Sequence, residues 1–281
     1  VWLFLMLGGL ANGLYAVNQP PADHAREFGK VLVQDQNGRF KPINTLSSEL
    51  LRKLSRKETY QGASADQVIL SMAVNPPLWY AEPVIKVGNQ TEIVSLLGVA
   101  GPMASYNDFF NQDGSYKLKE EIRAAFNREP RDRGVWEKEL IKIDERVNIM
   151  NMVFSGRFFR VFPIPDDENH TWQSPADMMH QHQGHTGEDF ISRFYPAYIQ
   201  TVREAKAQQD WDLANRLLEE LGRCQAQFSA EVLPSDTQIK AELLLNRLNI
   251  FSRLASVYGI LALVFLILLF TSVFSHQLNL T

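Results

Sequence analysis

The chain has 281 residues, of which 45% are hydrophobic and 21% are charged. This composition excludes a disordered polyampholyte and a collagen-like repeat, and the lone Cys224 excludes a disulfide-stabilised mini-domain. The 28 basic and 32 acidic residues give a formal net charge of -4, which argues against a nucleic-acid partner because such proteins usually carry a basic surface.

Both ends of the chain lack charged residues. The first charged residue is Asp23, and the 22 residues from 254 to 275 carry no formal charge. A helix of that length is about 33 Å long, enough for a hydrocarbon core of about 30 Å. The sequence therefore predicts transmembrane helices at residues 1–17 and 254–275, with the lipid bilayer as a partner.

The first apolar run begins at Val1, inside the hydrophobic stretch itself. It looks like a truncated transmembrane helix, and the chain looks like an internal fragment of a longer protein. The rival interpretation is a signal peptide, since Leu14-Tyr15-Ala16 loosely resembles a cleavage site, but no basic region precedes it. Two membrane helices would place residues 18–253 on one side of the membrane, as one domain with its own core.

The first half of that domain mixes strand and helix signals. Residues 30–34 predict a strand, closed by a tight turn at Asp35-Gln36-Asn37-Gly38. A helix opens at Pro42 and Asn44 and has leucines at the 3.6-residue period, and residues 64–74 predict a second helix. Two apolar runs, 79–87 and 91–97, flank Gly88-Asn89 and predict a β-hairpin.

The second half is predicted to be helical. Helices are expected at residues 116–126, 135–154, 190–208 and 211–231, with a strand at 157–164 and an irregular stretch at 166–187. Ser235 and Gln238 form a capping-box pattern that begins a further helix, which continues into the second apolar segment. The fold class is thus a mainly α domain with a small β component, held between two transmembrane helices.

A histidine cluster is the most chemically suggestive feature. Half of the six histidines lie within six residues, and dense imidazoles can bind a metal or haem iron. Their spacing does not match a helical i, i+4 pair with a placed carboxylate, and Gly184 and Gly187 favour a solvated polar loop. The candidate haem ligands are His180, His182 and His185.

Other candidate residues have simpler interpretations. His24 is interpreted as a solvated or helix-initiating residue rather than a ligand. Three aromatic pairs could line a pocket for a planar ligand, although a role in the core is favoured. These pairs are Trp79-Tyr80, Phe109-Phe110 and Phe158-Phe159. An enzyme that uses the three clustered histidines would lack a placed general base, and no self-contained catalytic site is found in the sequence.

Several short sequence segments resemble those of a known protein family. The early ones are Asp23-His24-Ala25, Phe28-Gly29, Val33-Gln34-Asp35, Gly38-Arg39 and Lys41-Pro42-Ile43-Asn44-Thr45. The later ones are Phe162-Pro163-Ile164-Pro165, Leu233-Pro234-Ser235, Ile239-Lys240-Ala241-Glu242 and Asn249-Ile250-Phe251. In these segments the chain resembles the extracytoplasmic region of ResB/CcsB-type cytochrome c biogenesis proteins, in the form fused to CcsA. The resemblance extends over most of residues 23–251 and includes no catalytic signature.

This resemblance implies a multi-pass protein of the bacterial cytoplasmic membrane with its main domain on the periplasmic side. Such a protein helps to deliver haem to apocytochrome c and to ligate it there, as part of a haem lyase complex. Its partners would be a CcsA-like haem-handling half and apocytochrome c. The tryptophan-rich haem-handling motif of the family belongs to that half and is not found in this sequence, so the resemblance implies no catalytic residue here. The alternative is a membrane-tethered sensor or ligand-binding domain, because two membrane helices around one outer domain are also receptor architecture.

Overall fold

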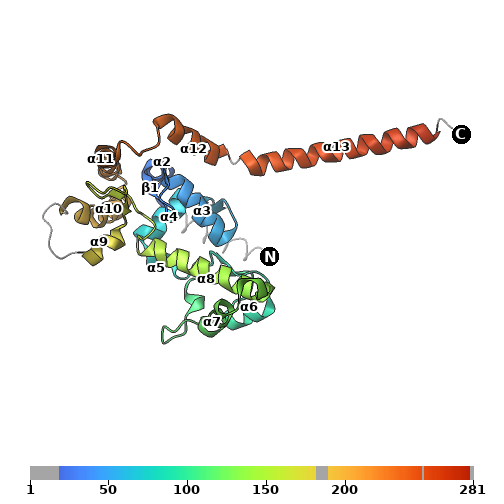
Figure 1. The fold of residues 1–281 in the computed structure, drawn as a ribbon, viewed down its shortest axis with the longest axis horizontal. Coiled ribbons are helices and arrows are strands. Elements are labelled where there is room, and N and C mark those ends of the chain that lie inside the picture. The colour runs from blue at the N-terminus through green and yellow to red at the C-terminus, as the bar shows by residue number, and fades with distance from the viewer. Residues whose placement is uncertain (1–18, 182–188, 249, 279–281) are drawn as a thin grey trace. The chain divides into compact units, whose positions relative to one another are not determined.

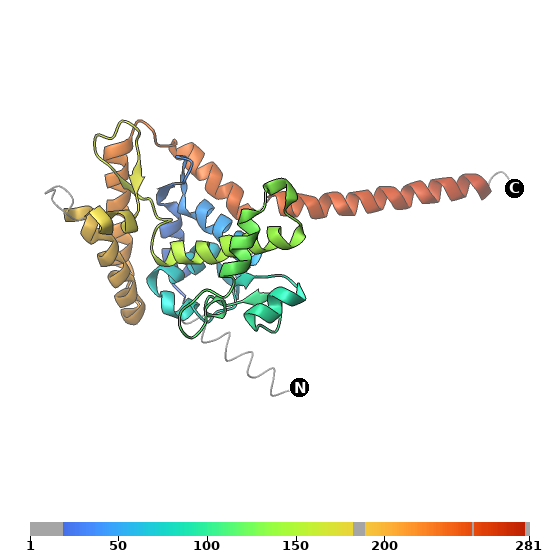
Figure 2. The same ribbon diagram turned by 60° about the horizontal axis from the view of Figure 1, so that its bottom comes forward.

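The computed structural model describes residues 19–181, 189–248 and 250–278, and these are mainly helical with a few short strands (Figures 1 and 2). The chain divides into two compact units, residues 1–235 and 236–281.

The first unit is built on three helices that contact one another, α2 (Ala22–Lys30), α3 (Ile43–Ser55) and α4 (Ala65–Val74). The periodic leucines of α3 are buried, as the sequence predicts, and α4 is buried on almost every side. A capping box begins α4: the Ser64 Oγ accepts from the Gln67 backbone N–H at 3.3 Å, and the Gln67 Oε1 accepts from the Ser64 N–H at 3.0 Å. The two helices predicted in this region are confirmed.

The described strands form antiparallel pairs. They are β1 (Leu32–Gln34) with β2 (Phe40–Pro42), β3 (Thr59–Tyr60) with β4 (Ala63–Ser64), β5 (Ile85–Lys86) with β6 (Met103–Ala104), and β7 (Phe162–Pro163) with β8 (Trp172–Gln173). The predicted strand and turn near residue 34 are confirmed as the first hairpin. Its turn is closed by the Asp35 carboxylate, which accepts from the backbone N–H groups of Asn37 and Arg39 at 2.9 and 3.1 Å.

The hairpin predicted around Gly88-Asn89 is wrong. Strand β5 lies in the first of the two runs and pairs with β6 instead. The short helix α5 (Pro76–Trp79) ends where that run begins, and the second run forms α6 (Thr91–Leu97). Ile93 and Leu97 are four residues apart and both are buried, so a helical face accounts for this apolar run. Gly98 then ends α6 in the left-handed conformation, with φ of 73°.

The rest of the first unit is helical. Its elements are η1 (Asn107–Phe109), α7 (Lys119–Asn127), η2 (Pro130–Asp132), α8 (Val135–Phe154), α9 (Pro175–Gln181), α10 (Asp189–Gln208) and α11 (Asp212–Ser229). The four predicted helices are confirmed in α7, α8, α10 and α11. Helices α10 and α11 pack against each other and contact α4 and α2, respectively. The strand predicted at 157–164 is reduced to β7, and the stretch predicted to be irregular contains β8 and α9.

The aromatic pairs contribute to the core of this unit. Trp79, Phe109 and Phe159 are almost fully buried. The indole N–H of Trp79 donates to the Ser71 Oγ at 3.1 Å, which satisfies its polar atom inside the core. The interpretation of these three rings as core residues is confirmed.

The second unit consists of α12 (Asp236–Leu248) and α13 (Ile250–Leu278). Helix α12 begins directly after Ser235, where the capping box is predicted. Within the ranges that the structure describes, no helix combines the length and apolar character needed to cross a membrane. The predicted span at 254–275 therefore stays a prediction, and residues 1–17 lie outside the described residues.

Candidate functional site

The predicted haem ligands fall largely beyond the described part of the chain. His182 and His185 lie outside the described residues, and His180 belongs to the end of α9. The described residues contain no group of three or more side chains that could hold a metal ion. Haem ligation by these histidines is therefore still a prediction.

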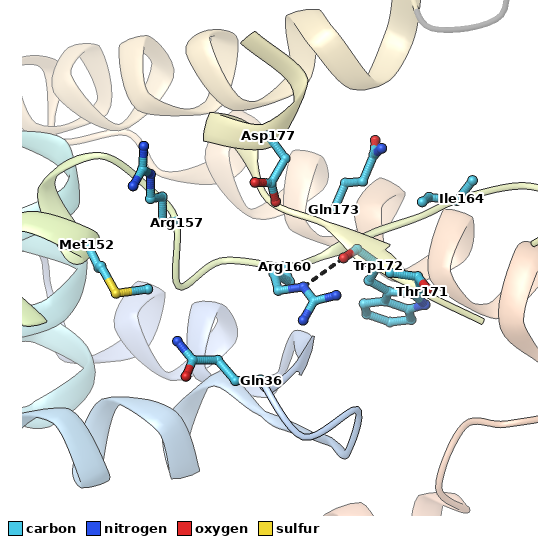
Figure 3. Close-up of a pocket in the computed structure, with 9 residues that line it drawn as sticks. All are labelled: Gln36, Met152, Arg157, Arg160, Ile164, Thr171, Trp172, Gln173 and Asp177. Carbon is cyan, nitrogen blue, oxygen red and sulfur yellow. Dashed lines mark hydrogen bonds between the residues drawn. The ribbon is translucent and has the colours of Figure 1, made fainter. Parts of the chain in front are cut away.

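A cleft of about 620 Å³ lies where the end of α8, the β1–β2 turn, the β7–β8 hairpin and the start of α9 meet. It is lined by Gln36, Met152, Arg157, Arg160, Ile164, Thr171, Trp172, Gln173 and Asp177. Figure 3 shows Met152 and Arg157 on one side of it, Arg160 and Trp172 on the other, and Gln36 and Asp177 at opposite rims. The sequence does not indicate this cleft, because its residues come from four separate stretches.

The first wall of the cleft is the C-terminal end of α8. Gly156 adopts a left-handed conformation with φ of 74°, and its N–H donates to the Val153 carbonyl at 3.1 Å. The next N–H, from Arg157, donates to the Met152 carbonyl at 2.9 Å. These two bonds form a Schellman motif, which fixes the two cleft residues Met152 and Arg157 against each other.

The second wall is the extended segment that carries Arg160, facing β8. The Arg160 Nε donates to the Trp172 carbonyl at 2.8 Å, and its Nη1 donates to the Asp35 carbonyl at 3.4 Å. Both acceptors are neutral backbone oxygens, so these bonds orient the guanidinium without neutralising its charge.

Two buried glutamines hold this wall against the rest of the first unit. Gln34 accepts from the Trp172 backbone N–H at 2.8 Å and donates to the His170 carbonyl at 2.9 Å. Gln225 of α11 donates to the carbonyls of Leu32 and Val161, both at 2.9 Å. Buried amides with satisfied hydrogen bonds add rigidity to a specific geometry. The cleft therefore has a pre-formed wall.

Asp177 forms one rim of the cleft and also begins α9. Its carboxylate accepts from the Ser174 backbone N–H at 2.9 Å and from the Ser174 Oγ at 2.7 Å. The Asp177 N–H donates in return to the Ser174 Oγ at 3.2 Å, which completes a capping arrangement. This carboxylate is engaged by the helix start, and no ion pair joins it to an arginine among the described residues.

His24 is buried and hydrogen-bonded, so its interpretation as a solvated residue is wrong, although it does lie in the first turn of α2. Its Nδ1 lies 2.6 Å from the Asn215 Oδ1, its Nε2 lies 3.0 Å from the Tyr198 hydroxyl, and its ring packs on Trp211 at 4.7 Å between centroids. Desolvation lowers its pKa, and the bond to Asn215 partly opposes that shift. Helix α2 places His24 on the same buried face as Phe28, an i, i+4 spacing that the sequence contains.

The aromatic side chains behind His24 leave little space for a ligand. A cavity of about 20 Å³ lies among Phe28, Phe159, Phe194, Tyr195 and Tyr198. Such a volume holds about one water molecule. The aromatic cluster of this core therefore has no room for a planar cofactor.

Two comparisons with known proteins bear on this chain. No protein-family model matches it. It is similar to Protein NrfI of Wolinella succinogenes, with 34% identity over 276 residues. The similarity covers 94% of this chain and 30% of NrfI, so the chain spans less than a third of the length of that relative. Nearly all of the chain is thus similar to one part of a much longer protein.

Proposed function

We propose that this chain is the ResB-like part of a membrane protein of c-type cytochrome biogenesis, which helps to deliver haem to apocytochrome c and to ligate it there. The observation that carries the proposal is the similarity to NrfI over 94% of the chain, which supports a role in cytochrome c maturation. This similarity agrees with the sequence segments within residues 23–251 that resemble the ResB/CcsB family.

The proposed location is the bacterial cytoplasmic membrane, with residues 18–253 on the periplasmic side. The apolar side chains of α13 support this placement, because those described between Leu254 and Phe270 are exposed. A continuous exposed apolar surface is unfavourable in water and favourable in lipid. Covalent haem attachment to c-type cytochromes takes place outside the cytoplasm, which requires such a topology in the proposed role.

The proposed partners are a CcsA-like haem-handling half, in the same or a separate chain, and apocytochrome c. In this arrangement the first unit supplies a docking surface and the cargo is haem. His180, His182 and His185 are proposed as weak haem ligands that act during transfer, since imidazole is a common axial ligand of haem iron.

Deletion of residues 18–253 from the full-length protein, with both apolar segments kept, tests the proposed function. Covalent haem in c-type cytochromes should be lost, whereas b-type haem proteins should be unaffected because they need no thioether bond. Haem staining after denaturing electrophoresis measures the first, and the absorbance spectrum of membranes measures the second. Normal haem-stained cytochrome c in the deletion strain would refute the proposal.

The triple substitution His180→Ala, His182→Ala and His185→Ala tests the histidine ligands. Loss of haem absorbance from the purified full-length protein, with a lowered cytochrome c yield, is the result expected for ligation. Unchanged absorbance and yield would exclude it. The matched control is His170→Asn, which replaces a histidine outside the cluster.

A further inference from the structure

The cleft described above carries two guanidinium groups that no carboxylate of the described residues neutralises. Arg160 is half-buried and its described bonds are to neutral carbonyls. The Arg157 guanidinium is exposed and forms no hydrogen bond or ion pair with any described residue. The carboxylate at the rim, that of Asp177, is engaged by Ser174. Two free positive charges in one cleft favour an anionic ligand, and guanidinium binds carboxylate groups through paired hydrogen bonds.

Part of the cleft lining is apolar. The lining includes the thioether side chain of Met152, the aliphatic side chain of Ile164 and Trp172, which is almost fully buried. A free phosphate would use the arginines and leave this apolar surface exposed to water. A volume of about 620 Å³ lies within the range of small-molecule sites, roughly 300 to 1,000 Å³. The cleft therefore fits a compact apolar molecule that carries acidic groups.

We infer that the cleft binds haem, with one propionate on Arg157, the other on Arg160, and the apolar macrocycle against Met152 and Ile164. The choice of haem among apolar dicarboxylates rests on the proposed function, in which haem is the cargo. The site would hold haem at the surface of the first unit, where it is accessible to an acceptor. It does not depend on the clustered histidines.

The geometry suits a transient site. One wall is fixed by the bonds of Gln34 to the Trp172 N–H and the His170 carbonyl. The other wall is fixed by the backbone bond between Arg157 and Met152. A pre-formed site binds without a large ordering cost, whereas its open mouth lets the ligand leave. Both properties suit delivery of a cargo rather than permanent storage.

Protoporphyrin IX and its dimethyl ester provide the test. Both compounds are flat, fluorescent and free of iron, so histidine ligation contributes to the binding of neither. They differ by the two carboxylate charges. The full chain, purified in detergent, should bind the diacid about 10- to 100-fold more tightly than the ester, the range expected for lost charge-assisted hydrogen bonds. Fluorescence titration gives the two dissociation constants.

Arg157→Gln should reduce this preference, because one of the two guanidinium contacts is lost, and Arg157→Lys should reduce it less. Because the Arg157 guanidinium has no partner among the described residues, its replacement should leave the fold intact, as circular dichroism would verify. Arg216→Gln, an exposed arginine of α11 that does not line the cleft, is the matched control. Equal binding of diacid and ester by the wild-type chain, or equal preferences in Arg157→Gln and Arg216→Gln, would overturn the inference.

The two proposals fail separately. If deletion of residues 18–253 abolishes cytochrome c but Arg157→Gln binds the diacid as the control does, the cleft inference is wrong and the function stands. If the diacid preference depends on Arg157 but the deletion strain makes normal cytochrome c, the function is wrong and the binding site stands.

Discussion

Burial of His24 links the stability of the first unit to pH. In the neutral form, Nδ1–H donates to Asn215 and Nε2 accepts from the Tyr198 hydroxyl, so both ring nitrogens are satisfied. Protonation at Nε2 would break the bond from Tyr198 and place a charge in a desolvated environment. Burial accordingly lowers the pKa of His24 from its ordinary value of 6.5.

A histidine whose pKa is lowered by folding contributes stability that is lost as the pH falls below the unfolded value of about 6.5. We expect the stability difference between wild type and His24→Gln to shrink as the pH is lowered from 8 to 5. At pH 8 the substitution should cost about 1 to 3 kcal/mol, because buried partners lose their hydrogen bonds. Urea unfolding across this pH range measures the difference, with His170→Asn as the control. A constant difference would contradict the buried neutral imidazole.

Asp66 should give stability a pH dependence opposite in sign to that of His24. Its carboxyl is buried and accepts from the Asn44 amide at 2.6 Å; desolvation raises its pKa to about 6, and that hydrogen bond partly opposes the shift. An acid with a raised pKa favours folding when protonated, so its contribution to stability falls as the pH rises from about 4 to 6. The free energy of unfolding of Asp66→Asn, relative to that of the wild type, should therefore rise by about 2 to 3 kcal/mol between pH 4 and 8. Unfolding midpoints at both pH values measure the gain, and an equal effect of the substitution at each would contradict it.

At the scale of elements, the end of α8 is sensitive to substitution. Gly156 has φ of 74°, and a Cβ atom there would lie 3.3 Å from the Tyr195 hydroxyl. Gly156→Ala combines an unfavourable left-handed backbone with a close contact, so it should lower the free energy of unfolding by about 1 to 3 kcal/mol. Thermal unfolding measures this loss. Gly222→Ala, within α11 and with no neighbour near the added Cβ, is the control and should be neutral or stabilising.

Periodicity predicted the helices well because most of them bury a single face. The leucines of α3 are an example: their spacing alone defines the face that packs inward. Residues 91–97 are an exception, because this apolar, partly β-branched run forms the short helix α6 and not the predicted strand. Periodicity also missed α9, whose start depends on the reciprocal bonds of Ser174 and Asp177 rather than on an apolar stripe.

The candidate site was not predictable from the sequence for a related reason. Gln34 and Gln225 read as ordinary polar residues, and their importance lies in bonds to backbone atoms far away in the chain. Arg157 and Arg160 stand three residues apart in a run that suggested a strand. Their shared cleft exists because that run is held in an extended loop by these distant glutamines. His24 shows the same limit, since its partners are 174 and 191 residues away in sequence.

At the scale of the whole molecule, the topology itself is testable. If residues 1–17 and 254–275 cross the membrane, the first unit should be digested by protease added to spheroplasts, and α13 should be protected. Immunoblotting for each segment measures this, with a cytoplasmic protein as the control for intact cells. Digestion of the first unit only after lysis would place it in the cytoplasm and contradict the proposed role.

The hydrogen bonds of the cleft wall also determine when this surface can form during synthesis. The bond from Gln225 to Leu32 spans 193 residues, and that from Trp172 to Ser229 spans 57. Contacts between distant parts of a chain form late and slowly, because a long loop must close first. A nascent chain that has reached only α10 lacks Gln225 and Ser229, so its cleft is incomplete. Only a fully synthesised and folded first unit would therefore bind a ligand at the cleft.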